Sequence, residues 1–171
     1  MAESAGSRRG GSGVGGVVGV PDPDEPGWVA VVKAVDRAGA VTQLAGVFST
    51  RGVNVDSIAT GMAGLGTADV TLTFRASEAR CRLLVRSVER LSSVREVVVC
   101  SEDDARVHAA AVVLMEPGVA FAPDPGLVLR WSGDTAAGEP LLAEGPFASV
   151  RELVRAAAPR ALSTGMTVSV L

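Results

Sequence analysis

Residues 67–75 alternate between polar and apolar side chains along their whole length. Every second position is apolar, namely Ala68, Val70, Leu72 and Phe74. A period of two predicts a β-strand with one buried face and one face in water. Such a strand is typical of an antiparallel sheet that helices cover on one side only.

Two helices and three further strands are predicted around this strand. A valine-rich run at residues 28–34 predicts a buried strand. Apolar residues then recur at helical spacing from residue 40 until Gly52, a C-cap glycine, and again after Ser77, a candidate N-cap. Residues 53–60 and 94–100 are predicted to be strands, and glycine-rich residues 61–66 a hairpin connection. The order strand-helix-strand-strand-helix-strand places residues 28–100 in the α+β class.

The two flanking segments are expected to differ from each other. Residues 1–27 are rich in Gly, Ser, Pro and acidic side chains and predict a disordered tail. The tail contains a literal G-x-G-x-x-G at residues 11–16, but neither a strand nor a helix adjoins it, so it predicts no phosphate loop. Residues 105–171 predict a smaller α/β segment, with strands near 107–115, 127–131 and 166–171 and a helix at 148–158.

Several classes of function are disfavoured by composition. The formal net charge of −3 provides no attraction to nucleic acid or to an anionic membrane. The apolar stretch at 107–115 is shorter than the roughly 20 residues needed to span a bilayer. His108 is the only histidine, and Cys81 and Cys100 fall on apolar faces as small buried side chains. We therefore expect no catalytic group, no metal site and no cofactor, and a reducing, cytoplasmic location.

The first turn and helix carry the candidate ligand site. Backbone N–H groups over residues 39–41 form a positive helix start that suits a carboxylate, and Gly39 lets a ligand approach closely. Asp36 can pair with an ammonium group, and Asn54 can donate and accept hydrogen bonds. These groups together suit a zwitterionic amino acid. The simpler alternative is that Asp36 caps the helix, Gly39 serves the turn and Asn54 ends a strand.

At these residues the sequence resembles the ACT domains. The resemblance rests on the stretch VVKAVDRAGAVTQLAGVFSTRGVNVDSIAT, with its turn at Asp36–Gly39 and its string Arg51–Asn54. Within that group it is most similar to the regulatory small subunit of acetolactate synthase. The resemblance implies a ferredoxin-like βαββαβ sandwich, an antiparallel sheet with two helices on one face.

The resemblance also implies partners and a site. ACT domains pair side by side, so we expect a homodimer that binds an amino-acid effector, with branched-chain amino acids as candidates, and that regulates a separate catalytic enzyme subunit. The turn and helix start of one protomer would face the second strand of the other. The implied ligand-binding residues are Asp36, Ala38, Gly39, Ala40, Val41, Asn54 and Val55.

Two features depart from that subunit. Asp36 stands where those subunits usually carry Asn, and residues 105–171 do not resemble their usual C-terminal half. These departures leave a second interpretation open, a protein-interaction module that has kept the ACT sandwich and lost the ligand.

Overall fold

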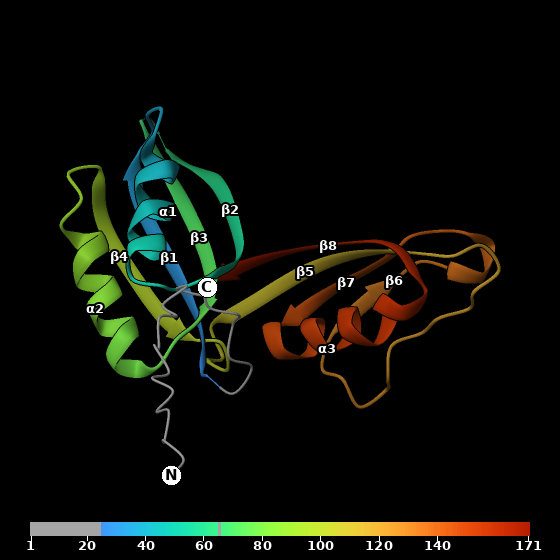
Figure 1. Cartoon of the computed structure of the whole chain (residues 1–171). Coiled ribbons are helices and arrows are strands. Elements are labelled where there is room, and N and C mark those ends of the chain that lie inside the picture. Colours follow the sequence, from blue (N-terminus) through green and yellow to red (C-terminus); the bar gives the residue numbers. More distant parts are fainter. Residues whose placement is uncertain (1–24, 65) are drawn as a thin grey trace, which may run out of the picture.

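The computed structural model describes residues 25–64 and 66–171, which form two sheet-based halves joined by a short turn (Figure 1). Residues 1–24 of the predicted tail, which include the glycine motif at residues 11–16, lie outside the described residues. The elements of the first half are β1 (Gly27–Val35), α1 (Ala40–Thr50), β2 (Val55–Gly64), β3 (Thr67–Arg75), α2 (Glu78–Glu89) and β4 (Val94–Ser101).

The first half is the predicted antiparallel sandwich. Its strand order is β2-β3-β1-β4, and β1 pairs with β3 from Gly27 opposite Arg75 to Val35 opposite Thr67. Both helices lie on one face of the sheet (Figure 1). The alternating apolar side chains of β3 pack under them, and the Phe48 and Phe74 rings meet edge to face at 5.1 Å. The period-two pattern therefore predicted both the strand and its buried face.

Glycine ends the first helix as predicted. Gly52 adopts a left-handed φ of 62°, and the N–H of Val53 returns to the carbonyl of Phe48 at 3.0 Å. The glycine-rich connection is shorter than predicted, because β2 continues through residues 61–64 before the chain turns into β3.

The second half is a further four-stranded antiparallel sheet with the order β6-β7-β5-β8. Its elements are β5 (Val107–Met115), β6 (Arg130–Ser132), η1 (Thr135–Ala137), β7 (Leu141–Pro146), α3 (Phe147–Ala157), η2 (Ala158–Arg160) and β8 (Ala161–Val170). The prediction of β5 is confirmed, and that of α3 is confirmed within one residue. β7 was missed, and β8 begins five residues earlier than predicted.

The two halves share a core. Val29 of β1 points away from α1 and α2, and it packs with Cys100 against Phe147 and Val150 of the second half. Glu102 lies at the same junction and pairs with Arg75 of β3 and Arg151 of α3. Burial of apolar side chains between the halves therefore holds them together.

Both cysteines are buried and unpaired, as predicted. Burial raises the pKa of the Cys81 thiol to about 11, so this side chain stays protonated and behaves as a small apolar residue at neutral pH. Among the described residues, no helix combines the length and apolar character needed to cross a membrane.

Candidate functional site

A hollow of about 260 Å³ lies at the start of α1. The turn at Asp36 and Arg37 forms one side of it, and Ala40 and Val41 of the first helical turn form another. Its remaining lining comes from the ends of strands in the same protomer, Ala34, Val35, Thr60, Gly61, Ala68 and Val70. The hollow is therefore aliphatic at its base and charged at its mouth.

Helix α1 begins without a side-chain cap. Its N-cap is Gly39, which adopts a left-handed conformation (φ 86°, ψ −6°), and no side chain of the described residues accepts a hydrogen bond there. In α2, by contrast, the Ser77 hydroxyl accepts a hydrogen bond from the N–H of Arg80. The N–H of Ala40 donates to the backbone carbonyl of Arg37 at 3.2 Å, so it is the other N–H groups of the first turn that solvent or a ligand can meet. The simpler interpretation, in which Asp36 caps this helix, is wrong.

Backbone hydrogen bonds hold the turn before α1. The N–H of Val35 donates to the carbonyl of Ser93 at 2.8 Å, and the N–H of Asp36 donates to the carbonyl of Gly66 at 3.0 Å. The Asp36 side chain stays exposed at the mouth of the hollow. An exposed carboxylate on a fixed turn can meet an ammonium group with little reorganisation.

Arg37 is a site residue that the sequence analysis missed. It lines the hollow beside Asp36, and its Nη2 donates a long hydrogen bond of 3.5 Å to the hydroxyl of Ser92. An arginine next to an uncapped helix start can bind a carboxylate in bidentate fashion. Its neighbour Asp36 was a signal that could have drawn attention to it.

The predicted site residues fall into two groups. Asp36, Ala40 and Val41 line the hollow, and Ala38 and Gly39 connect them in the chain. Asn54 and Val55 do not line it, because Val55 pairs with Phe74 at the opposite end of β2. Val55 and Gly61 are six steps apart along the extended chain, about 20 Å at the usual rise of a strand. The expectation that both belong to a partner protomer stays a prediction.

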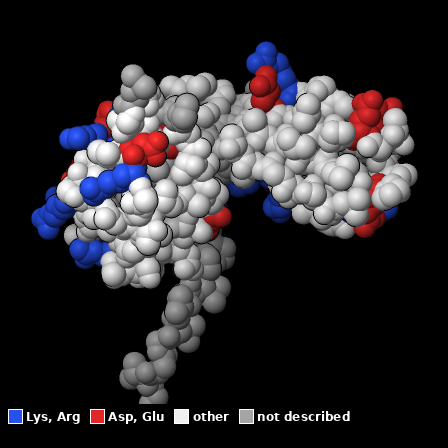
Figure 2. Space-filling view, turned by 90° about the horizontal axis from the view of Figure 1, so that it is seen from above, with Lys and Arg blue, Asp and Glu red and all other residues white. Residues whose placement is uncertain are grey.

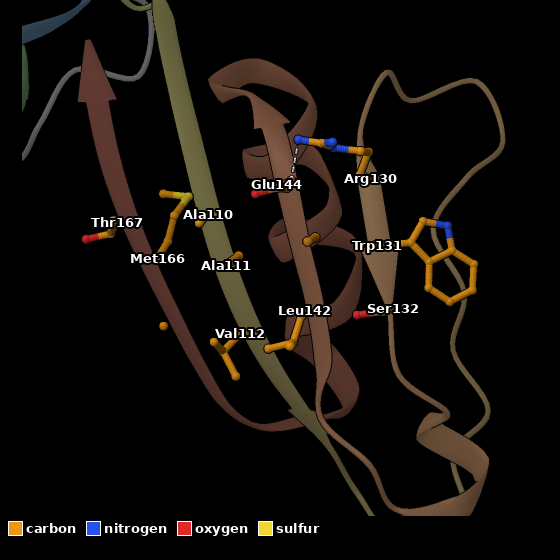
Figure 3. Close-up of a pocket in the computed structure, with 12 residues that line it drawn as sticks. Ala110, Ala111, Val112, Arg130, Trp131, Ser132, Leu142, Glu144, Met166 and Thr167 are labelled. Atoms are coloured by element: carbon orange, nitrogen blue, oxygen red, sulfur yellow. Dashed lines mark ion pairs between the residues drawn. The ribbon is translucent and has the colours of Figure 1, made fainter. Parts of the chain in front are cut away.

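Other hollows lie outside this region. One of about 150 Å³ occupies the junction between the halves, where Glu102 pairs with both Arg75 and Arg151. Burial raises the pKa of Asp56 there, against the opposing effect of Arg75. A larger hollow of about 660 Å³ lies on the second sheet, far from the α1 turn in the fold (Figures 1 and 3). Its lining combines aliphatic side chains with the Arg130–Glu144 ion pair and the hydroxyls of Ser132 and Thr167.

Among the residues that the structure describes, no three His, Cys, Asp or Glu side chains come together as metal ligands. His108 lies on the outer side of β5, between the buried residues Val107 and Ala109. The charged groups of the α1 hollow are suited to bind and orient a ligand.

Comparisons with known proteins give no match to a protein-family model and none to a curated protein. Among solved structures, the chain is similar to the acetolactate synthase small subunit from Thermotoga maritima, with a TM-score of 0.63 and 13% identity over 85% of this chain and 96% of that one. It also matches the ACT domain from GTP pyrophosphokinase of Chlorobium tepidum, with a TM-score of 0.40 and 18% identity over 44% of this chain and 99% of that one.

The first match extends beyond the βαββαβ sandwich. Coverage of 85% of the chain is more than residues 28–100 alone could account for. The likeness in fold therefore extends into the second half, although residues 105–171 show no such resemblance in sequence. The chain has the ACT-type α+β fold of an acetolactate synthase small subunit, a βαββαβ sandwich followed by a second four-stranded sheet.

Proposed function

We propose that this protein is a regulatory subunit that binds an amino acid at the start of α1 and modulates a partner enzyme, for which acetolactate synthase is the first candidate. One observation carries the proposal. A glycine-started, uncapped helix opens onto a hollow with a carboxylate and a guanidinium at its mouth and aliphatic side chains at its base.

The hollow suits the three parts of an aliphatic amino acid. The first-turn N–H groups of α1, together with Arg37, would bind the α-carboxylate. Asp36 would pair with the ammonium group. Ala34, Ala68 and Val70 offer an aliphatic surface for a short side chain, and branched-chain amino acids have a suitable size for about 260 Å³.

A second protomer would complete the site. β2 is an edge strand of the first sheet, so its outer hydrogen-bonding groups can pair with another β2. An antiparallel pair related by a two-fold axis would place the beginning of one β2 beside the end of the other. The partner's Asn54 would then approach Thr60 and Gly61, which line the hollow. This arrangement would unite the two groups of predicted residues.

The choice of partner enzyme rests on fold. The solved structure that the chain resembles over both halves is an acetolactate synthase small subunit. Cytoplasmic location and action on a separate catalytic chain follow from the same analogy.

One observation favours a different function. The second half has a larger and more apolar hollow than the α1 turn, which fits the alternative of a ligand-free interaction module. Calorimetric titration of the full-length protein with each of the twenty amino acids distinguishes the two functions. Heat of binding from one or a few aliphatic amino acids supports regulation by ligand, and silence for all twenty would reject it.

A matched pair of variants tests the location of the site. Gly39→Asp places a carboxylate at the helix start, and a Cβ there meets no atom within 4 Å in the protomer. Gly138→Asp is the control, because Gly138 has a similar φ of 83° and equally open surroundings. We expect Gly39→Asp to weaken binding by about tenfold or more through like-charge repulsion with the ligand carboxylate. Equal affinity in both variants would show that the site lies elsewhere.

The enzyme partner needs a separate experiment. Purified full-length protein, immobilised and exposed to acetolactate synthase catalytic subunit, should retain that subunit and change its response to the bound amino acid. If the catalytic subunit is not retained although the protein still binds the amino acid, the protein would be a sensor that regulates a different enzyme.

A further inference from the structure

The second sheet has one covered face and one open face. Val150, Leu153 and Ala157 of α3 cover the side that carries the buried residues of β5 and β7. The open side still carries aliphatic residues, and Val112 and Leu142 are 48% and 47% exposed there. An apolar sheet face generally packs against a second layer.

The strand register places two rows of side chains across this open face. The first row runs Arg130, Glu144, Ala110 and Thr167, from β6 to β8. Directly opposed residues of an antiparallel sheet lie on the same face, so these four side chains are neighbours. The row starts with an ion pair of 2.7 Å between Arg130 and Glu144 and ends with small side chains.

The second row runs Ser132, Leu142, Val112 and Gly165. Leu142 and Val112 lie next to each other and form a ridge (Figure 3). The 660 Å³ hollow lies along this ridge, and it meets a second hollow of about 500 Å³ at the Arg130–Glu144 row. The open face therefore has two larger aliphatic side chains, Leu142 and Val112, beside the small residues Ala110 and Gly165.

The charge on this face is balanced. Arg130 and Glu144 are 87% and 57% exposed in their side chains, so their mutual attraction within the protomer adds little to stability. Strand β8, which borders the face, has no charged residue from Ala161 to Val170. In the view from above, the second half is largely uncharged between charged side chains at its rim (Figure 2).

We propose that the open face of the β6-β7-β5-β8 sheet is a two-fold interface with a second copy of this chain. A two-fold axis brings the same patch of both copies together, so the larger side chains of one copy can face the small residues of the other. The Leu142–Val112 ridge of one copy lies over the partner's Ala110 and Gly165. Arg130 meets the partner's Glu144, and the reverse contact follows from symmetry.

Charge complementarity favours a second copy over other occupants. A strongly charged partner would meet only the Arg130–Glu144 ion pair on this face, which has no net charge. A second copy supplies an opposite charge for each member of that pair. The interface is separate from the β2 edge. Together with the proposed pairing at β2, a two-fold interface here builds an assembly larger than a dimer, which closes as a tetramer where the two axes meet at right angles, so the face determines the size of the assembly beyond the proposed regulatory function.

Leu142→Asp tests the interface by placing an unpaired charge on the ridge. The control is Leu83→Asp, because Leu83 of α2 is 51% exposed and lies in the first half. We expect Leu142→Asp to halve the mass of the full-length protein in sedimentation equilibrium and Leu83→Asp to leave it unchanged. Far-UV circular dichroism reports whether each variant is folded.

A charge-reversal series tests the contact directly and does not depend on the fold of the ridge variant. Arg130→Glu and Glu144→Arg should each weaken association by about tenfold or more, because like charges then face each other across the axis. The double variant Arg130→Glu/Glu144→Arg restores opposite charges and should regain the wild-type mass. An intact assembly in both single variants would overturn the proposal, as would a double variant that fails to recover.

Two further results would also overturn it. One is a monomeric wild-type protein at micromolar concentration. The other is a Leu142→Asp variant with wild-type mass that no longer retains acetolactate synthase catalytic subunit, since the face would then belong to the enzyme. Calorimetry on the same variant separates the two proposals, because amino-acid binding at α1 does not involve this face.

Discussion

The two halves of the molecule have sheets of the same size but differ in what their uncovered faces carry. In the first half, α1 and α2 cover one face, Val29 on the other face packs against the second half, and Lys33 farther along that face is flanked in register by Asp69 and Glu96. Lys33 and Glu96 form an exposed ion pair of 3.2 Å. In the second half, the face opposite α3 carries one exposed ion pair, Arg130–Glu144, and beside it the exposed aliphatic residues Val112 and Leu142. A charged open face can remain in water, whereas an aliphatic one indicates a protein partner.

The halves also meet in one core, so they should unfold together. Each half contains one tryptophan, Trp28 in β1 and Trp131 in β6. Single-tryptophan proteins, with Phe at the other position, can therefore report on each half separately.

The largest effect is expected from Phe74→Ala in the first half. Phe74 is 1% exposed and packs edge to face on Phe48, so its loss should cost about 3–5 kcal/mol. Because the halves share a core, the midpoint of urea unfolding reported by Trp131 fluorescence should shift as far as the midpoint reported by Trp28. An unmoved Trp131 transition would show that the second half folds independently.

Leu153→Ala is the corresponding change in the second half. Leu153 is fully buried between α3 and the sheet, and its truncation should cost about 2–5 kcal/mol. Both tryptophans should again report one transition. Exposed Leu142→Ala provides the comparison, and in the dissociated protein it should change the free energy of unfolding far less.

A smaller effect is expected from the helix starts. Ser77→Ala removes the cap of α2 and should cost about 1 kcal/mol. Asp36→Ala should leave stability nearly unchanged, because Asp36 caps no helix, while it should weaken amino-acid binding. Urea denaturation and calorimetry of the two variants measure these effects. A destabilisation by Asp36→Ala equal to that by Ser77→Ala would contradict the contrast between α1 and α2.

The smallest effect concerns the turn between the halves. Hydrogen bonds from Arg106 lower the pKa of the Asp104 carboxyl to about 2, below its ordinary value of 3.8. A depressed pKa in the folded state stabilises the protein above the unfolded-state pKa, and this contribution is lost as the pH falls from about 3.8 to 2. Titration of the Asp104 carboxyl by NMR should give the low pKa in the wild type. Arg106→Gln should return it toward 3.8.

Short-range patterns predicted the first half well and the second half in part. Alternation in β3 and helical spacing after residue 40 depend on neighbouring residues alone, and both predictions are confirmed. β7 was missed because its six residues include Gly145 and end at Pro146, residue types that usually interrupt strands. The fold likeness of residues 105–171 was missed because it exists in three dimensions and has no counterpart in sequence resemblance.

The sequence by itself determined the strands and helices of the sandwich, the glycine at the start of α1 and the chemistry of the Asp36 turn, because each depends on local backbone and side-chain preferences. Tertiary structure decided which of these groups meet. In the fold, Arg37 and Thr60 line one hollow, Asn54 lies beside the far end of β2, and Val29 faces the second half. Such contacts join residues distant in the chain, so they follow from the packing of whole sheets and helices.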